Sequence, residues 1–241
     1  MTRTIIHSQQ ADASDPPSSE RRLIVTIDGP AGAGKSTVAK RLAQRLGYLY
    51  LETGALYRAV AWKVATSGVS PSDQQGVASL LPVTRITMEP GGVEARVLVD
   101  GKDVSGEIRA PEISRIASIV SAIPAVREWL LPLQRQLGSA RGLVAEGRDL
   151  GTRIFPGADV KFFLEADVEV RTARRALELK AAGDAAVLEQ TREAIRARDA
   201  RDRSRDLAPL VPAPDASVID TSALDADQVV DRMMAVIAKK L

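Results

Sequence analysis

Residues 29–36 read Gly-Pro-Ala-Gly-Ala-Gly-Lys-Ser, which matches the pattern G-x-x-x-x-G-K-[ST]. A short apolar run precedes this stretch at residues 23–27, and Val38, Leu42 and Leu46 follow it at helical spacing. Glycines between a strand and a helix let several backbone N–H groups face one anion at the positive end of the helix. The stretch therefore predicts an α/β fold built around a phosphate-binding loop (P-loop).

The P-loop pattern assigns roles at a bound nucleotide. Lys35 is expected to reach the β- and γ-phosphates of ATP, and the Ser36 hydroxyl is expected to ligate Mg²⁺. ATP and Mg²⁺ are the cofactors that this reading requires. The ATP-binding residues predicted from the loop are Gly29, Pro30, Ala31, Gly32, Ala33, Gly34, Lys35 and Ser36.

Composition narrows the class of protein. The chain has 241 residues, of which 45% are apolar and 27% charged, as is typical of a globular protein. The absence of cysteine excludes disulfides, thiolate metal sites and cysteine nucleophiles. A net charge of +2 argues against general nucleic-acid binding. We expect a monomer whose partners are small molecules, with neither nucleic acid nor membrane among them.

The first residues look different from the rest. Residues 1–22 lack the apolar core of a signal peptide and contain Pro16 and Pro17, which indicates a disordered leader. No apolar run in the chain approaches the ~20 residues of a membrane span, so a cytoplasmic location is expected. His7, the only histidine, lies in this leader. The chemistry is therefore expected to proceed without histidine acid–base catalysis.

Strand and helix patterns alternate along most of the chain, which predicts a parallel sheet flanked by helices. Further strands are predicted at residues 48–51, 143–145, 160–164 and 217–220, and helices at 54–67, 167–182, 185–205 and 225–240.

The middle of the chain departs from this alternation. Two strands are predicted at residues 83–88 and 93–99, on either side of Pro90-Gly91-Gly92. In the second, valine and alanine alternate with polar residues, as in a half-exposed antiparallel strand. We expect residues 23–241 to form one domain with an insertion at about 70–108 that carries a small antiparallel sheet. Residues 110–137 look helical, with Pro124 at a helix start and Pro132 at a kink or break.

Absent motifs separate classes of nucleotide-binding protein. The sequence contains no asparagine and therefore no N-K-x-D motif, which GTPases use to read guanine. The L-S-G-G-Q signature of transporter ATPases is also missing. A small-molecule kinase is favoured, and a non-catalytic nucleotide-binding regulator remains as the alternative from another class.

A second anion site is indicated by arginines near strand ends, where open α/β sheets bind ligands. The residues concerned are Arg58 after the second strand, Arg148 and Asp149 after the third, and Arg198, Asp202 and Arg205 on one helix face. The five arginines within residues 196–205 also fit a solvated helix face. An RNA-binding patch would require aromatic residues between the arginines, and none lies there.

From about residue 23 to its end, the chain resembles the bacterial cytidylate (CMP) kinases, which are nucleoside monophosphate kinases with a P-loop. The resemblance implies a core domain, a monophosphate-binding insertion and a short lid at about residues 172–186. It also implies transfer of the γ-phosphoryl group of Mg-ATP to CMP and dCMP, with a kinase for UMP or another monophosphate as the runner-up. It rests on blocks at residues 27–35, 53–58, 103–109, 146–152, 198–205 and 208–212, which read IDGPAGAGK, TGALYR, DVSGEIR, EGRDLGT, RDARDRSR and APLVP.

Residue roles follow from the resemblance. The acceptor phosphate is expected to be held by Arg58, Arg148 and Arg205, and cytosine to be read by Ser118, Arg127 and Asp149. The sugar is expected to bind Arg198 and Asp202, with Thr53 and Tyr57 lining the acceptor site. Lid residues Arg174 and Arg175 are expected to close over the transferring phosphoryl group, so the implied catalytic residues are Lys35, Arg148, Arg174 and Arg175.

Two positions depart from the family pattern. Glu52 and Glu146 stand where the family often has aspartate, which leaves open whether either supports Mg²⁺. Some members have glycine at the Ser36 position, so Thr37 is added to the ATP-binding residues as a second hydroxyl. A phosphate acceptor is already ionised near pH 7, and phosphoryl transfer is mostly positioning and charge stabilisation. A site rich in arginine and free of histidine suits that reaction.

Overall fold

The computed structural model describes residues 22–89, 95–181 and 187–241. The expected leader up to residue 21, the Pro90-Gly91-Gly92 turn and residues 182–186 of the expected lid lie outside these ranges. The described chain contains a five-stranded sheet whose paired strands are all parallel, in the order β2-β6-β1-β7-β8. Its strands are β1 Ile24–Asp28, β2 Leu49–Glu52, β6 Leu143–Glu146, β7 Val160–Glu165 and β8 Ser217–Asp220.

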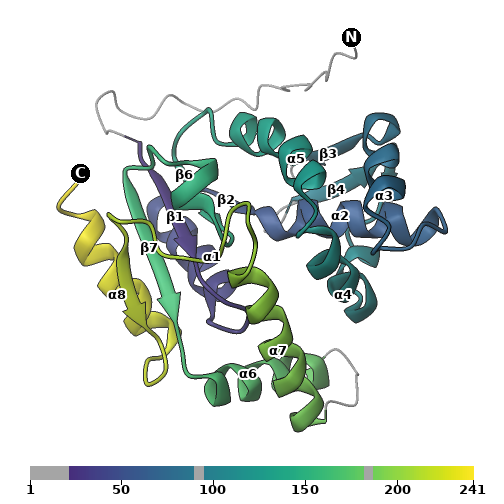
Figure 1. The fold of residues 1–241 in the computed structure, drawn as a ribbon. Helices are drawn as coiled ribbons and strands as arrows, with labels where there is room; N and C mark the ends of the chain where they lie inside the picture. The colour runs from purple at the N-terminus through teal and green to yellow at the C-terminus, as the bar shows by residue number, and fades with distance from the viewer. Residues whose placement is uncertain (1–21, 90–94, 182–186) are drawn as a thin grey trace.

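Apolar residues on both faces hold this sheet between helices (Figure 1). Along β6, Val144 packs with α1 (Lys35–Leu46) and α8 (Ala226–Ile237), whereas Leu143 and Ala145 pack on the opposite side. The opposite side is covered by α5 (Pro124–Leu137) and by η3, a short π-helical turn at Leu150–Ile154. The predicted parallel sheet flanked by helices is confirmed, with β1 at its centre.

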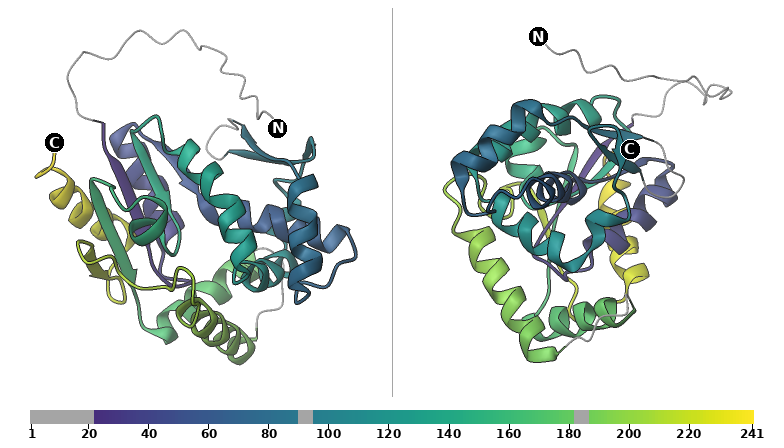
Figure 2. Two further views of the ribbon diagram at one scale, coloured as in Figure 1. Left: turned by 45° about the horizontal axis from the view of Figure 1, so that its top comes forward. Right: turned by 90° about the vertical axis from the view of Figure 1, so that its right-hand side faces the viewer.

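A second, smaller sheet forms a separate layer (Figure 2). As predicted, it is antiparallel, and the buried side chains of Val97 and Val99 alternate with more exposed neighbours. The hydrophobic cluster around it reaches from Ala55 to Leu130, beyond the expected insertion, because helices on either side contribute to it. The elements here are α2 Thr53–Thr66, α3 Gln74–Leu80, η1 Leu81–Val83, β3 Ile86–Glu89, β4 Arg96–Val99, β5 Lys102–Asp103, η2 Glu107–Arg109 and α4 Pro111–Val120.

The helical region at residues 110–137 breaks just before Pro124, where a helix start was predicted, but not at Pro132. Two helices, α4 and α5, meet at residues 121–123, and α5 continues through Pro132. Packing explains the continuity, because Leu130 lies in one hydrophobic cluster and Leu131 packs against another. These contacts offset the ~3 kcal/mol that an interior proline costs a helix. Pro124 does begin α5, as predicted.

The helices of the described ranges are short relative to the thickness of a bilayer. No single helix there has the length and apolar character to cross a bilayer. Among the described helices, only the pair α4 and α5 together has the length and apolar composition of a membrane span, and the two are bent by 103° at their junction.

A helical hairpin formed by α6 (Val168–Ala181) and α7 (Leu188–Arg203) extends from the sheet (Figure 1). A buried ion pair joins the two helices, with Arg171 Nη1 2.6 Å from Asp199 Oδ2 and both side chains 6% exposed. The same Nη1 donates to the P-loop carbonyl of Ala31 at 3.2 Å. One guanidinium thus ties the hairpin together and ties it to the P-loop.

We expect Arg171→Leu to lower the free energy of unfolding by about 3–5 kcal/mol, because it leaves the Asp199 carboxylate buried without its partner. Arg45→Leu is the matched control, since Arg45 also joins two helices but pairs with Asp231 in solvent. Its cost is expected to stay within about 1 kcal/mol. Urea unfolding of both variants measures the difference. Equal losses of unfolding free energy would show that the buried ion pair contributes no more to stability than the exposed one.

Candidate active site

A cavity of roughly 240 Å³ opens where β1, β2 and β6 end. Parallel pairing puts the carboxyl ends of these strands at one edge, and the segment that follows each strand lines the cavity. Residues of α4, α5, α6 and α7 complete the wall. The predicted donor and acceptor sites therefore share one space.

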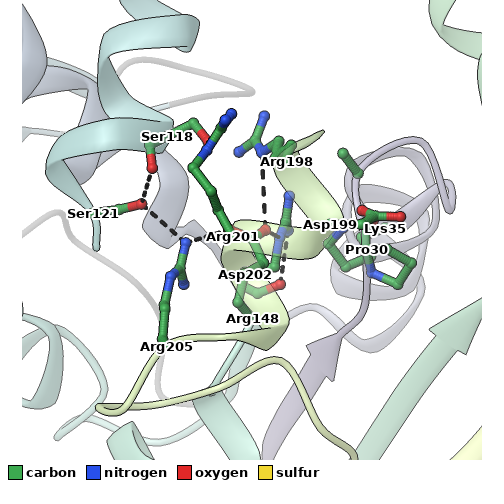
Figure 3. Close-up of polar contacts among 12 residues, drawn as sticks. Pro30, Lys35, Ser118, Ser121, Arg148, Arg198, Asp199, Arg201, Asp202 and Arg205 are labelled. Atoms are coloured by element: carbon green, nitrogen blue, oxygen red, sulfur yellow. Dashed lines mark hydrogen bonds and ion pairs between the residues drawn. The ribbon is translucent and has the colours of Figure 1, made fainter. Parts of the chain in front are cut away.

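Backbone geometry shapes the P-loop side of the cavity. Gly29 has φ +147°, and a Cβ there would lie 2.2 Å from the Leu164 carbonyl oxygen, so the loop can pass only as glycine. Lys35 is buried, and its Nζ donates to the Pro30 carbonyl at 2.7 Å (Figure 3). Burial and then the field of Arg148 lower the pKa of Lys35 to about 7. An anion placed on this loop would favour the charged form of Lys35.

Two glutamates lie beside the start of α1. Register pairs Glu52 with Glu146, and the Tyr50 hydroxyl donates to Glu146 at 2.5 Å. Burial and then the proximity of Glu52 raise the pKa of Glu146, and a hydrogen bond with the Ser36 hydroxyl opposes that rise. Carboxylate and hydroxyl oxygens are the donors that Mg²⁺ prefers, so these residues fit that ion. No group of three or more His, Asp or Glu side chains in the described residues could hold a metal without a nucleotide's phosphates.

Asp202 organises the arginines on the acceptor side (Figure 3). It is 1% exposed, lies 3.0 Å from Arg148 Nε and 3.9 Å from Arg198 Nε, and accepts a hydrogen bond from Arg205. Burial acts to raise the pKa of Asp202, but the fields of the arginines, chiefly Arg148, hold it below its usual value. Burial and then the charge of Arg148 lower the pKa of Arg198 to about 10. The cluster therefore carries more positive charge than one carboxylate neutralises.

A second buried ion pair lies in the wall of the same cavity. Arg127 Nη2 lies 2.5 Å from Asp149 Oδ2, with side chains 3% and 4% exposed, and the guanidinium stacks 5.3 Å above the Tyr57 ring. Arg58 pairs with Glu52 at 2.7 Å. Among the described residues that line the cavity, four arginines have a buried Nε, a hydrogen-bond donor, without a hydrogen-bond partner: Arg58, Arg127, Arg198 and Arg205.

Most of the predicted site residues meet in this cavity. The lining includes Ala31, Gly32, Gly34, Lys35, Ser36, Thr37, Thr53, Tyr57, Arg58, Arg127, Arg148, Asp149, Arg175, Arg198, Asp202 and Arg205. Five others do not line it, namely Gly29, Pro30, Ala33, Ser118 and Arg174. Arg174 instead donates to the hydroxyl and carbonyl of Thr221. The Ser118 hydroxyl accepts from Arg201 at 3.1 Å.

The cavity also contains residues that sequence reasoning did not single out. Ser121 accepts from Arg205 at 3.0 Å, and Ser114 and Glu178 lie in the wall. A signal was available in the spacing of Ser114, Ser118 and Ser121, which places three hydroxyls on one face of α4 and its carboxyl end. The arginines that bond two of these hydroxyls come from α7 and the residues just after it, far along the chain.

Known proteins resemble this chain over nearly its whole length. It is 48% identical over 220 residues to a cytidylate kinase of Syntrophotalea carbinolica, covering 91% of this chain and 94% of that one. A cytidylate kinase of Geobacillus kaustophilus is 45% identical, with 92% of this chain and 99% of that one covered. A solved structure of an uncharacterized protein from Eubacterium ventriosum aligns over 90% of this chain and 99% of its own, with TM-score 0.51 and 14% identity, which indicates a shared fold. The family model for cytidylate kinase matches residues 25–239, and the chain belongs to the cytidylate kinase family.

Proposed function

We propose that this protein transfers the γ-phosphoryl group of Mg-ATP to CMP and to dCMP, giving ADP and the nucleoside diphosphate. The observation that supports this most directly is the single cavity that joins a P-loop to buried arginine N–H groups without partners. Such donors are costly to bury unless a ligand satisfies them. A second phosphate beside the ATP phosphates is the ligand whose charge and acceptor oxygens match them.

On the donor side, the P-loop from Gly29 to Thr37 holds the ATP phosphates through backbone N–H groups. Lys35 exchanges its bond to the Pro30 carbonyl for the phosphates. Ser36 would hold Mg²⁺ together with the ATP phosphates, with Glu146 beside it. When bound, the ion would supply charge neutralisation between the two nucleotides.

On the acceptor side, Arg58, Arg148 and Arg205 hold the CMP phosphate, using donors that Glu52 and Asp202 do not fill. Arg198 and Asp202 bind the sugar, with Thr53 and Tyr57 beside the nucleotide. The base is read by Ser118, Arg127 and Asp149. Arg174 and Arg175 act from the lid, where Arg174 leaves Thr221 when the hairpin closes.

The chemistry needs no general base. An oxygen of the CMP phosphate forms a bond to the γ-phosphorus as the bond to the β-phosphate oxygen breaks, and ADP leaves with that electron pair. Lys35, Arg148 and the lid arginines stabilise the charge on the group in transfer. The same proposal takes residues 23–241 as one kinase domain, with an insertion at about 70–108 and a lid at about 172–186. It also takes the protein as a monomer without a nucleic-acid partner.

A panel of acceptors tests the function. ADP release from ATP is measured with CMP, dCMP, UMP, AMP and GMP in turn, and CMP and dCMP are expected to have the highest kcat/KM. A preference for UMP or a purine nucleotide would show that the protein is a nucleoside monophosphate kinase with a different acceptor. ATP binding with no phosphorylation of any of the five would favour the non-catalytic regulator.

Lys35→Ala is expected to lower kinase activity at least ~100-fold while the protein stays folded, because it removes a charge that stabilises the transition state. Arg41→Ala is the control on the same helix, since Arg41 pairs with Asp227 in solvent. Steady-state kinetics and thermal unfolding measure both variants. Near-normal turnover by the Lys35 variant would remove the P-loop from the mechanism.

Asp149→Asn is expected to lower the preference for CMP over UMP by ~1–3 kcal/mol, mostly by weakening CMP. A carboxylate accepts a hydrogen bond from the amino group of cytosine but faces a carbonyl acceptor in uracil. The measurement is kcat/KM for both nucleotides. If both fall by the same factor, Asp149 serves to hold Arg127 or Arg148 and does not read the base.

A further inference from the structure

Asp28 is a buried carboxylate to which the proposed reaction gives no role. It ends β1, directly before Gly29 of the P-loop, and is 5% exposed. Its Oδ1 accepts from the Leu150 N–H at 2.9 Å, and its Oδ2 accepts from the Gly151 N–H at 2.8 Å. Both donors lie more than 120 residues further along the chain.

These two N–H groups begin the short helix η3 (Leu150–Ile154). The first N–H groups of a helix lack partners within it, and aspartate directly before the helix is a preferred cap. Asp149 occupies that position but makes no capping hydrogen bond with its side chain. Its carboxylate instead faces Arg127 at 2.5 Å in the cavity. Asp28 thus supplies the cap that the local sequence would assign to Asp149.

The arrangement is costly, which argues that it is more than an incidental contact. Burial raises the pKa of Asp28 to about 6, although the two N–H groups and then Lys35 oppose that rise. The like charge of Asp149 adds to the rise. The carboxylate is nevertheless mostly ionised at neutral pH, the form that accepts both hydrogen bonds.

We propose that Asp28 is a positioning residue for the acceptor nucleotide: by capping η3 it leaves the Asp149 carboxylate free for the base and fixes the Arg148–Asp149 segment to the P-loop. The inference rests on the CMP kinase activity proposed above. It extends that proposal by assigning base selectivity partly to a residue that does not touch the base. Asparagine at position 28 would present an N–H₂ group to one of the two N–H donors, and the freed donor would draw Asp149 away from the cavity.

The test compares Asp28→Asn, Asp149→Asn and the double variant in the full chain. For Asp28→Asn, the ratio of kcat/KM for CMP to that for UMP is expected to fall about five- to tenfold, the usual size of a lost helix cap. The ATP dissociation constant should change by a smaller factor than this ratio, because Arg171 still holds the P-loop at the Ala31 carbonyl. In the Asp149→Asn background, Asp28→Asn should change the ratio less than about twofold, because its effect passes through Asp149.

Asp159→Asn is the matched control. Asp159 accepts from the Ile24 N–H at 2.8 Å, at the opposite end of the same strand, so the variant disturbs β1 without touching η3. Its CMP to UMP ratio should equal that of the wild type. The proposal would be overturned if Asp28→Asn left the CMP to UMP ratio unchanged. It would also be overturned if Asp28→Asn changed the ratio equally in the wild type and in the Asp149→Asn background.

If Asp28→Asn does not fold, the pH dependence of the CMP to UMP ratio in the wild type tests the proposal. Lys35 and Asp149 are the charged groups whose fields act on Asp28. The CMP to UMP ratio should fall below about pH 6, as Asp28 takes up a proton, and a flat ratio from about pH 5 to 8 would contradict the proposal. The acceptor phosphate also titrates near pH 6, but it is common to both nucleotides and cancels in the ratio. If neither nucleotide is phosphorylated, the proposed function fails, and the ratio of CMP to UMP dissociation constants still judges Asp28.

Discussion

Mutual repulsion among closely spaced cations is the constraint that the site must satisfy. Two like charges at contact repel by ~4 kcal/mol where the effective dielectric constant is about 20. Asp202 offsets this repulsion for three arginines at once, since Arg148, Arg198 and Arg205 all lie against it. Burial is the main cause of the lowered pKa values of Lys35 and Arg198, but the field of Arg148 adds to both, so the compensation is incomplete. Positive field therefore remains for anions, so a site built this way favours phosphates before any contact forms.

The sequence predicted where these charges meet because one rule of parallel sheets covers them. The segments carrying Lys35, Arg58 and Arg148 each follow a strand, and parallel pairing puts all three strand ends at one edge. The helical spacing of Arg198, Asp202 and Arg205 placed these residues on one face of α7 and its end. In the structure Asp202 is buried on that face, where it contacts Arg148 and Arg205. The local sequence pattern and the parallel pairing of strands were therefore sufficient to predict that these charged residues meet.

Residues whose partners come from distant segments could not be predicted in the same way. Asp28 lies directly before the P-loop motif, but its hydrogen bonds with Leu150 and Gly151 depend on how β6 pairs with β1. The continuity of α5 through Pro132 depends on two separate hydrophobic clusters, whereas the proline itself suggested a kink or break there. Arg174 points to Thr221 for a similar reason, since that threonine follows β8 at the far side of the sheet. Each of these is a competition between a local preference and a long-range contact.

The P-loop is held from two sides, and this limits where movement can occur. Asp28 ties the start of η3 to the start of the P-loop, and Arg171 ties the α6–α7 hairpin to the Ala31 carbonyl. A loop fixed in this way can meet phosphates without reorganising, which is the condition under which backbone dipoles stabilise charge best. The contacts between α7 and α4 are of another kind, because Arg201 and Arg205 meet the hydroxyls of Ser118 and Ser121, which are neutral. Hydrogen bonds from arginine to a neutral hydroxyl are weaker than those to a carboxylate or a phosphate. Under the proposed function, an incoming nucleotide phosphate would displace Ser121 from Arg205, which stays paired with Asp202. The contact between Arg205 and the end of α4 would then yield to substrate while the P-loop keeps its shape.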